Sequence, residues 1–168
     1  MAGVIVVTTP QTVSLQDARR GLAMFLQMGV PVLGVVENMT AFIPPDAPDK
    51  RYELFGSGGG ALLAEEAGVP LLAQLPMELA VVQGGDAGRP AVLSAPDSLT
   101  AEAFRRLAER VLGGVPDPEI PAISILDLGS VRAVSCEDDR VAVTVTPTYG
   151  GCPATEVIRE DICSALQA

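Results

Sequence analysis

The chain has 168 residues and a formal net charge of −10, with 11 Lys and Arg against 21 Asp and Glu. Hydrophobic residues make up 48% of it, enough to fill a packed core, and a charged fraction of 19% is too low for a wholly disordered chain. The acidic balance disfavours a nucleic-acid partner, because few cations are present to neutralise phosphates. No apolar run is long enough to span a bilayer, so we expect a cytoplasmic protein without a membrane partner.

The residue types that are missing exclude several kinds of site. The chain has no His, which excludes Ser-His-Asp triads and His-ligated metal sites. It has a single lysine, Lys50, and no G-x-x-x-x-G-K sequence, so it contains no Walker A loop. Its three cysteines form no CxxC pair, and in an acidic, unsecreted chain they are expected to be reduced thiols.

Strands and helices alternate over the first two thirds of the sequence. Buried strands are expected where β-branched and apolar residues run together. A helix is expected to start at Ser14, with Asp17 three residues later forming a capping box, and to end at Gly29. Strands are expected at 4–8, 32–36 and 71–75, with further helices at 61–67, ending at Gly68, and from Asp97 or Ser98 to Val111. This alternation predicts a partial doubly wound parallel α/β sheet.

The segment Gly113–Pro118 contains two Gly and two Pro and marks a domain boundary. We therefore expect one domain at 1–113 and a smaller α/β domain at 114–168. In the second domain, strands are expected at 123–128, 131–135 and 141–146, followed by a helix at 154–166.

Cys152 is the most informative candidate for chemistry. Gly150 and Gly151 allow a tight turn before it, and Pro153 suits the first position of a helix. The unpaired N–H groups at a helix start favour the thiolate, which could bind a soft metal, hold an iron–sulfur cluster or exchange with another thiol. The alternative is a small buried residue beside glycines. Cys136 and Cys163 are interpreted as packing residues.

Other polar residues could support that cysteine. Asp117 and Glu119 lie on a Pro-stiffened segment, where they either support a cysteine site or form a solvated acidic linker. Thr148 borders the cysteine loop together with Thr146 and Tyr149, where such residues commonly satisfy loop hydrogen bonds.

Two features of the first domain have both a functional and a structural interpretation, and a third is interpreted as structural. Gly56–Gly60 precedes a helix and is either an anion-binding nest or a flexible joint. Asn38 follows a predicted strand, where open α/β sheets bind ligands, or it is an ordinary turn residue. Asp86 and Arg89 are expected to pair and hold a loop.

The first domain resembles the C-terminal half of the Mrp/ApbC family, iron–sulfur carrier ATPases related to ParA and MinD. The resemblance covers residues 2–113 and implies a P-loop NTPase-like sheet, homodimerisation and a nucleotide base near Asn38. The family's Walker A loop would lie ahead of Met1, and the CxxC of many members is absent from 42–49. The matching phrases are Thr8–Gln11, Asp17–Gly21, Pro31–Met39, Phe55–Gly60 and Gly85–Pro90.

Residues 115–168 resemble the first part of the PaaD/SufT-like family of iron–sulfur maturation factors. The resemblance implies that Cys152 is a reactive cysteine with Asp117 close to it, and PaaD is associated with maturation of phenylacetyl-CoA epoxygenase. The two modules are in reversed order and cut short, which suggests a fusion, a fragment or an engineered chimera. The matching phrases are Asp117–Pro121, Asp127–Gly129, Thr144–Thr148 and Gly151–Glu156.

Together these features predict a non-catalytic iron–sulfur assembly or carrier accessory protein with Cys152 as thiolate ligand. Its expected partners are iron–sulfur client or scaffold proteins and either a second copy or a complementing chain. Three alternatives are an ATP-binding carrier subunit whose Walker loop comes from another chain, a PaaD-like maturation factor, and a fragment without activity. An enzyme that uses Cys152 as nucleophile would lack a His base.

Overall fold

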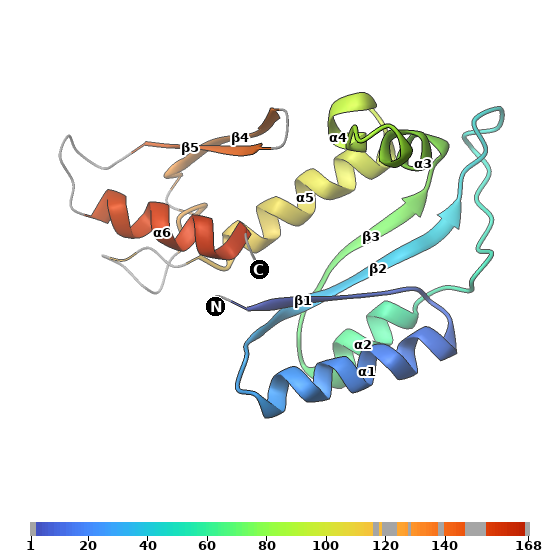
Figure 1. Ribbon diagram of the computed structural model, residues 1–168, viewed down its shortest axis with the longest axis horizontal. Coiled ribbons are helices and arrows are strands. Elements are labelled where there is room, and N and C mark those ends of the chain that lie inside the picture. The colour runs from blue at the N-terminus through green and yellow to red at the C-terminus, as the bar shows by residue number, and fades with distance from the viewer. Residues whose placement is uncertain are drawn as a thin grey trace. The chain divides into compact units, whose positions relative to one another are not determined.

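A computed structural model of the protein describes residues 3–115, 118, 124–127, 129–137, 140–146 and 154–166. The chain divides into two compact units, one comprising Gly3–Phe104 and the other beginning at Arg105 (Figure 1). The division falls inside helix α5 (Leu99–Gly113). None of the helices in the described ranges is long and apolar enough to cross a membrane.

The first unit is built on a three-stranded parallel sheet in the order β1-β2-β3. Its strands are β1 (Val4–Thr8), β2 (Val32–Phe42) and β3 (Leu71–Met77). The predicted bounds of β1 are confirmed. β2 and β3 extend beyond the predicted 32–36 and 71–75. Their pairing has an irregularity between Asn38 and Phe42, and it resumes where Phe42 pairs with Met77.

Helices α1 and α2 cover one face of this sheet (Figure 1). The helices of the unit are α1 (Thr12–Gln27), α2 (Gly59–Ala67), α3 (Leu79–Asp86), α4 (Ala91–Ser94) and the first turns of α5. Buried apolar side chains from both helices and from two strands form its core, namely Val6, Leu15, Leu22, Val35, Leu63 and Ala64. This packing confirms the α/β architecture that the alternating pattern predicted.

α1 and α2 end just before Gly29 and Gly68, the glycines that were predicted to end them. The predicted start of α1 is wrong. Gly29 and Gly68 adopt left-handed φ values of 68° and 67° just after the two helices, a conformation that favours glycine. At the start of α1, the N-cap is Gln11 and makes no side-chain cap. Ser14 is already inside the helix, where its hydroxyl accepts a hydrogen bond from Thr9 Oγ1 at 2.7 Å.

Two side chains fix the start of α5. The Ala101 N–H donates to Ser98 Oγ at 3.1 Å, so Ser98 caps the helix as expected. The Thr100 N–H donates to Glu78 Oε2 at 2.6 Å, which ties α5 to the segment after β3. The pattern did not predict α3 and α4, which are short. The expected pair between Asp86 and Arg89 is not among the ion pairs of the described residues.

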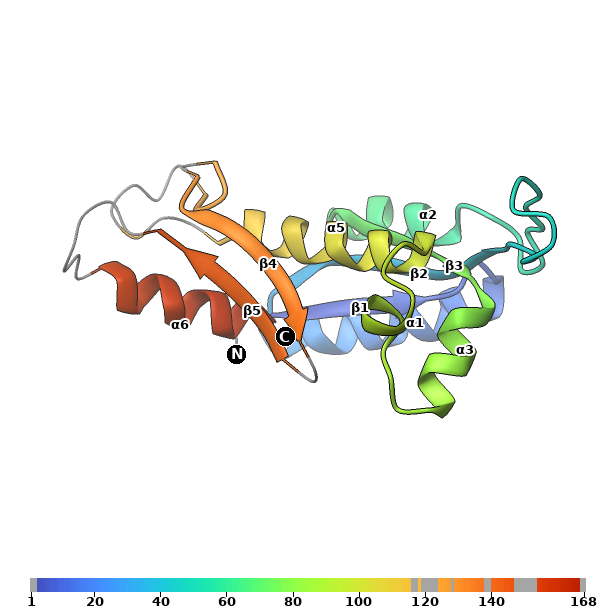
Figure 2. The ribbon, with the colours of Figure 1, turned by 90° about the horizontal axis from the view of Figure 1, so that it is seen from above.

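The second unit contains an antiparallel hairpin of β4 (Val131–Glu137) and β5 (Arg140–Val145), with α6 (Ala154–Leu166) alongside it (Figures 1 and 2). The predicted bounds of α6 are confirmed. The predicted strand at 123–128 is wrong over residues 125–127, which form a turn after an isolated bridge at Ser124, whose hydroxyl donates to Asp127 Oδ2 at 2.7 Å. The buried core consists of Leu112, Val115, Ile125, Ile158, Ile162 and Ala165.

A bidentate ion pair joins α1 to α2 on the surface of the first unit. Arg19 Nε lies 2.8 Å from Glu66 Oε2, and Arg19 Nη2 lies 2.9 Å from Glu66 Oε1. The hydrogen bond from Arg19 lowers the pKa of Glu66 below its ordinary value of 4.5. A group with a lowered folded-state pKa stabilises the fold above its unfolded pKa, and this contribution is lost as the pH falls through the folded pKa.

We predict that Glu66→Gln lowers the melting temperature slightly at pH 7, because exposed pairs contribute little to stability. The difference from the wild type should shrink below pH 4.5 and vanish once the carboxylate of the wild type is protonated. Thermal unfolding followed by circular dichroism over this range measures it. Asp17→Asn, which breaks the more exposed pair with Arg20, is the control and should have a smaller effect at pH 7. A difference that persists unchanged in acid would contradict this interpretation.

Candidate functional site

Three polar side chains form a row across the sheet towards the carboxyl ends of its strands. Thr8, Glu37 and Gln74 are register partners on β1, β2 and β3. The Glu37 side chain is fully buried, although acidic residues are rarely buried without partners. The row therefore places a carboxylate in the interior, level with the carboxyl end of β1.

The Glu37 carboxylate caps helix α2. The backbone N–H of Gly60 donates to Glu37 Oε2, and the Gln74 amide donates to Glu37 Oε1 at 2.9 Å. Gly58, the N-cap of α2, supplies no side-chain cap of its own. A negative charge at a helix start is also favoured by the helix dipole. One carboxylate thus joins β2, β3 and α2.

Close packing makes this contact possible. A Cβ atom on Gly60 would lie 2.6 Å from the Cβ of Glu37, closer than two carbon atoms can approach. Glycine at this position lets the helix start lie directly on the strand. The segment Gly56–Gly60 therefore ends in a fixed contact with the sheet, and its interpretation as a flexible joint is not supported at Gly60.

The same contact decides whether Gly56–Gly60 suits a phosphate group. A phosphate cradle presents free N–H groups and a positive helix end to an anion. Here the protein's own carboxylate already accepts the Gly60 N–H, and its negative charge would repel a second anion. The chain also lacks a Walker A sequence. This segment does not fit the phosphates of ATP.

Asn38 lies inside β2, not after a strand end as predicted. Its Oδ1 accepts a hydrogen bond from the N–H of Met39 at 2.8 Å. Met39 has a φ of 57°, which makes it the one non-glycine residue with a left-handed backbone in the part of the chain that the structure describes. Such strain in a non-glycine residue costs on the order of 1–3 kcal/mol and occurs often at functional sites. Asn38 is partly exposed.

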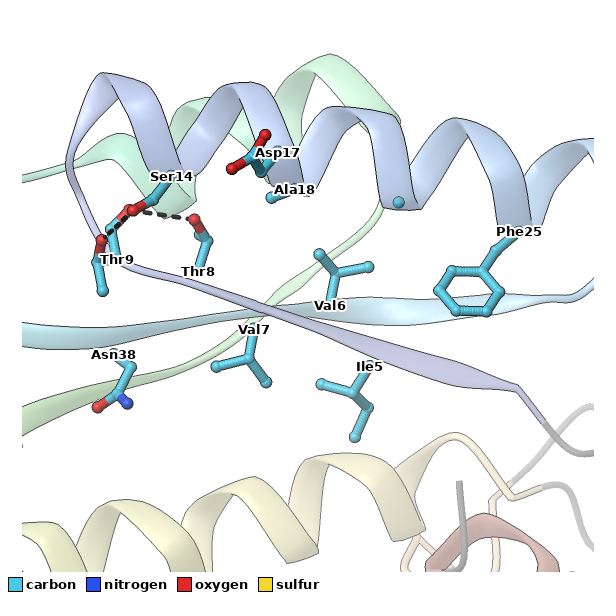
Figure 3. A pocket seen from close by; sticks show the side chains of 11 residues that line it. Ile5, Val6, Val7, Thr8, Thr9, Ser14, Asp17, Ala18, Phe25 and Asn38 are labelled. Carbon is cyan, nitrogen blue, oxygen red and sulfur yellow. Dashed lines mark hydrogen bonds between the residues drawn. The ribbon is translucent and has the colours of Figure 1, made fainter.

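A groove of about 530 Å³ runs along β1 beside this row, and we call it the β1–α1 groove. Its floor is the segment Ile5–Thr9, and residues of α1 form its wall (Figure 3). Thr8, Thr9, Ser14 and Asp17 line one end on the side of α1, Asn38 borders the same end from the opposite side of the sheet, and the rest of the lining is apolar or glycine (Figure 3). The groove is therefore polar at the carboxyl end of β1 and apolar along its length.

The residues predicted to perform chemistry in the second unit lie outside the described residues. They are Cys152, Asp117, Glu119, Thr148 and Tyr149. Thr146 is described, and its hydroxyl accepts a hydrogen bond from Arg132 Nε at 3.2 Å, as expected of a residue that satisfies local hydrogen bonds. The interpretation of Cys163 as a packing residue is wrong, because this thiol is free and exposed on α6. Cys136 lies in β4.

The described residues contain no cluster of three or more Cys, Asp and Glu side chains that could hold a metal ion. The structure brings Asn38 to the groove. Sequence reasoning missed the role of Glu37. The sequence signal for this role is a single acid directly after the apolar run Val32–Val36. An acid buried at such a position needs hydrogen-bond partners.

The arrangement of the first unit defines an α/β protein of the P-loop NTPase type. MinD from Pyrococcus horikoshii, solved as a complex with Mg-ADP, superposes with a TM-score of 0.51 and 29% identity, covering 66% of this chain and 41% of MinD. The family model of ParA, described as NUBPL iron-transfer P-loop NTPase, matches residues 1–112, and the chain belongs to this family. A second family model, iron–sulfur cluster assembly protein, matches residues 107–168.

Curated relatives agree with these matches. An iron–sulfur cluster carrier protein of Synechocystis is 58% identical over 115 residues, which are 68% of this chain and 33% of the relative. An iron–sulfur protein required for NADH dehydrogenase in Arabidopsis mitochondria is 38% identical over 126 residues, 71% of this chain and 40% of the relative. The chain thus spans between 33% and 40% of the length of these two relatives.

We predict that Glu37→Ala lowers the free energy of unfolding by about 2–4 kcal/mol, because two buried donors lose their acceptor and a cavity opens. Glu37→Gln should cost less, since it keeps the volume and one acceptor oxygen. Urea unfolding monitored by circular dichroism measures both values.

The matched control for this prediction is Glu65→Ala, which removes an exposed acid from α2, the helix that Glu37 caps. It should change the unfolding free energy by less than about 0.5 kcal/mol. Equal effects of the substitutions at positions 37 and 65 would show that the buried carboxylate does not hold α2.

Proposed function

We propose that the chain is an iron–sulfur cluster assembly or carrier accessory protein that is not catalytic by itself. The observation that supports this most directly is the pair of family matches, an iron-transfer NTPase family over 1–112 and an iron–sulfur assembly family over 107–168. Two independent matches to iron–sulfur proteins on one chain favour a common cargo. Its partners would be iron–sulfur client or scaffold proteins in the cytoplasm.

In this proposal, the domain at 114–168 binds the cargo through the thiolate of Cys152. Helix α6 begins at Ala154, so Cys152 stands two residues before the first helical residue. Free N–H groups and the helix dipole at such a position favour the ionised thiol that iron requires. Asp117, Glu119 and Thr148 would support this site. A single thiolate leaves coordination positions for a second chain, which suits transfer between proteins.

The domain at 1–113 would serve as a docking or dimerisation scaffold. The lack of a Walker A sequence supports a role without ATP hydrolysis by this chain alone, and the Glu37 carboxylate on Gly60 makes the start of α2 unsuitable as a phosphate site. Asn38 keeps a proposed role as the contact for a nucleotide base, since its side chain borders the β1–α1 groove. Such a nucleotide would require phosphate ligands from another chain.

We predict that anaerobic reconstitution with iron and sulfide gives visible charge-transfer absorbance in the wild type, and that Cys152→Ser loses most of it. The physical reason is that a hydroxyl is a poor ligand for iron compared with a thiolate. Absorbance spectra and iron content per chain measure the result.

The matched control is Cys163→Ser, which removes an exposed thiol from α6 and should leave cluster loading close to that of the wild type. Loading that falls equally in the Cys152 and Cys163 variants would point to adventitious iron on exposed thiols. No loading of any variant would contradict the carrier role.

A further inference from the structure

Helix α3 presents apolar side chains to the solvent. Leu79 and Val82 are 49% and 60% exposed, and their spacing of three residues places them on one face of the helix. Gln83 and Asp86 continue this face towards the end of the helix, because they lie about one and two turns beyond Leu79. The face is therefore apolar over the first turn of α3 and polar over the second.

Close backbone packing holds the opposite side of α3. Gly84 is the one buried residue among the residues of this helix, all of which the structure describes. The N–H of Arg89 donates to the carbonyl of Gly84 at 2.7 Å, and a Cβ atom on Gly84 would collide with the carbonyl oxygen of Arg89. At about 3.6 residues per turn, Gly84 lies about 140° around the helix from Leu79 and about 160° from Val82. The contact therefore keeps both apolar side chains turned away from the segment that follows α3.

The start of α5 adds a third apolar side chain. Glu78, the N-cap of α3, accepts a hydrogen bond from the N–H of Thr100 through its carboxylate at 2.6 Å. This bond brings the first residues of the two helices, Leu79 and Leu99, to the same end of β3 (Figures 1 and 2). Leu99 is 52% exposed. We call the surface of Leu79, Val82 and Leu99 the α3–α5 face.

The charge around the α3–α5 face is acidic. Asp86 lies on the exposed face of α3, and Asp97 is exposed just before α5. Residues 76–104 contain one basic residue, Arg89, against four acidic residues, namely Glu78, Asp86, Asp97 and Glu102. An apolar centre with a charged rim is typical of protein–protein contacts, and the sign of the rim selects the charge of the partner.

We propose that the α3–α5 face docks an amphipathic helix of a partner protein, with apolar side chains at its centre and Lys or Arg side chains at its rim. The spacing of Leu79 and Val82 supports a helical partner, because side chains three residues apart form a ridge that fits the groove of another helix. The inference rests on the proposed docking role of the first unit and names the chemistry of the partner. It involves neither Cys152 nor iron.

A second copy of the chain fits this face less well. A twofold contact brings the same patch of both copies together, so Asp86 and Asp97 would meet the same acids of the other copy. Like charges in a contact disfavour the pair, and each copy carries a net charge of −10. Three apolar side chains also form a small contact, which suits a transient partner that buries less than about 1,200 Å² rather than a stable dimer.

The test uses the whole chain, isotope-labelled, and the acetylated and amidated peptide Lys-Leu-Ala-Lys-Leu-Leu-Lys-Ala-Leu-Ala-Lys-Lys, whose leucines share one face of a helix. One control peptide has the same composition with the leucines spread around the helix, and a second has Glu in place of every Lys. In an NMR titration, the first peptide should shift the amide resonances of Leu79, Val82 and Leu99. Both control peptides should bind at least about 10-fold more weakly, because one lacks the apolar face and the other is repelled by the acidic rim.

Two variants show whether binding occurs at this face. Val82→Lys places a cation in the α3–α5 face and should weaken binding of the first peptide at least about 10-fold. Val13→Lys makes the same change at an exposed position of α1 and should alter the affinity by less than about 2-fold. Circular dichroism checks that both variants fold.

The proposal is overturned if the first peptide leaves the three resonances unchanged, if the Glu peptide binds as tightly, or if Val82→Lys weakens binding no more than Val13→Lys. Shifts of the same resonances with protein concentration in the absence of peptide would identify a second copy as the occupant and would also overturn it. None of these outcomes bears on cluster loading at Cys152, which the reconstitution experiment measures separately.

Discussion

The buried carboxylate of Glu37 is the constraint on which the first unit depends. A fully buried acid must have its oxygens satisfied, and here the donors come from Gly60 at the start of α2 and from Gln74 on β3. These bonds fix where α2 begins and how closely it lies on β2. Because Gly60 has no Cβ, the contact is as short as the backbone allows. These contacts join β2, β3 and α2 at the polar row.

This constraint separates the roles of the two units. A sheet of the P-loop NTPase type commonly uses a helix start for phosphate, but in this unit the start of α2 is satisfied from within. The described residues of the unit also form the groove along β1. The chemistry that we propose belongs to the second unit and its cysteine, and we propose that the first unit serves in recognition. A carrier needs both, a ligand for its cargo and a surface that selects its partner.

Local signals predicted much of the fold, and long-range contacts explain what they missed. Gly68 ended a helix as expected, because a left-handed residue after a helix is a property of the local backbone. Ser14 was mistaken for a cap, since the pattern does not reveal that Thr9 competes for its hydroxyl. The hydrogen bond between Glu37 and Gly60 joins residues 23 positions apart in the sequence. The left-handed backbone of Met39 leaves no trace in the pattern of apolar and polar residues. Neither feature could be predicted from neighbouring residues.

The central claim, that the Glu37 carboxylate occupies the start of α2, is tested most directly by the amide resonance of Gly60. Titration of the isotope-labelled chain with inorganic phosphate, and then with Mg-ATP, follows this resonance by NMR. If the carboxylate holds the Gly60 N–H, the resonance stays unchanged at concentrations of phosphate that bind to open helix starts. A saturable shift of Gly60 would show that an external anion reaches this helix and would contradict the account.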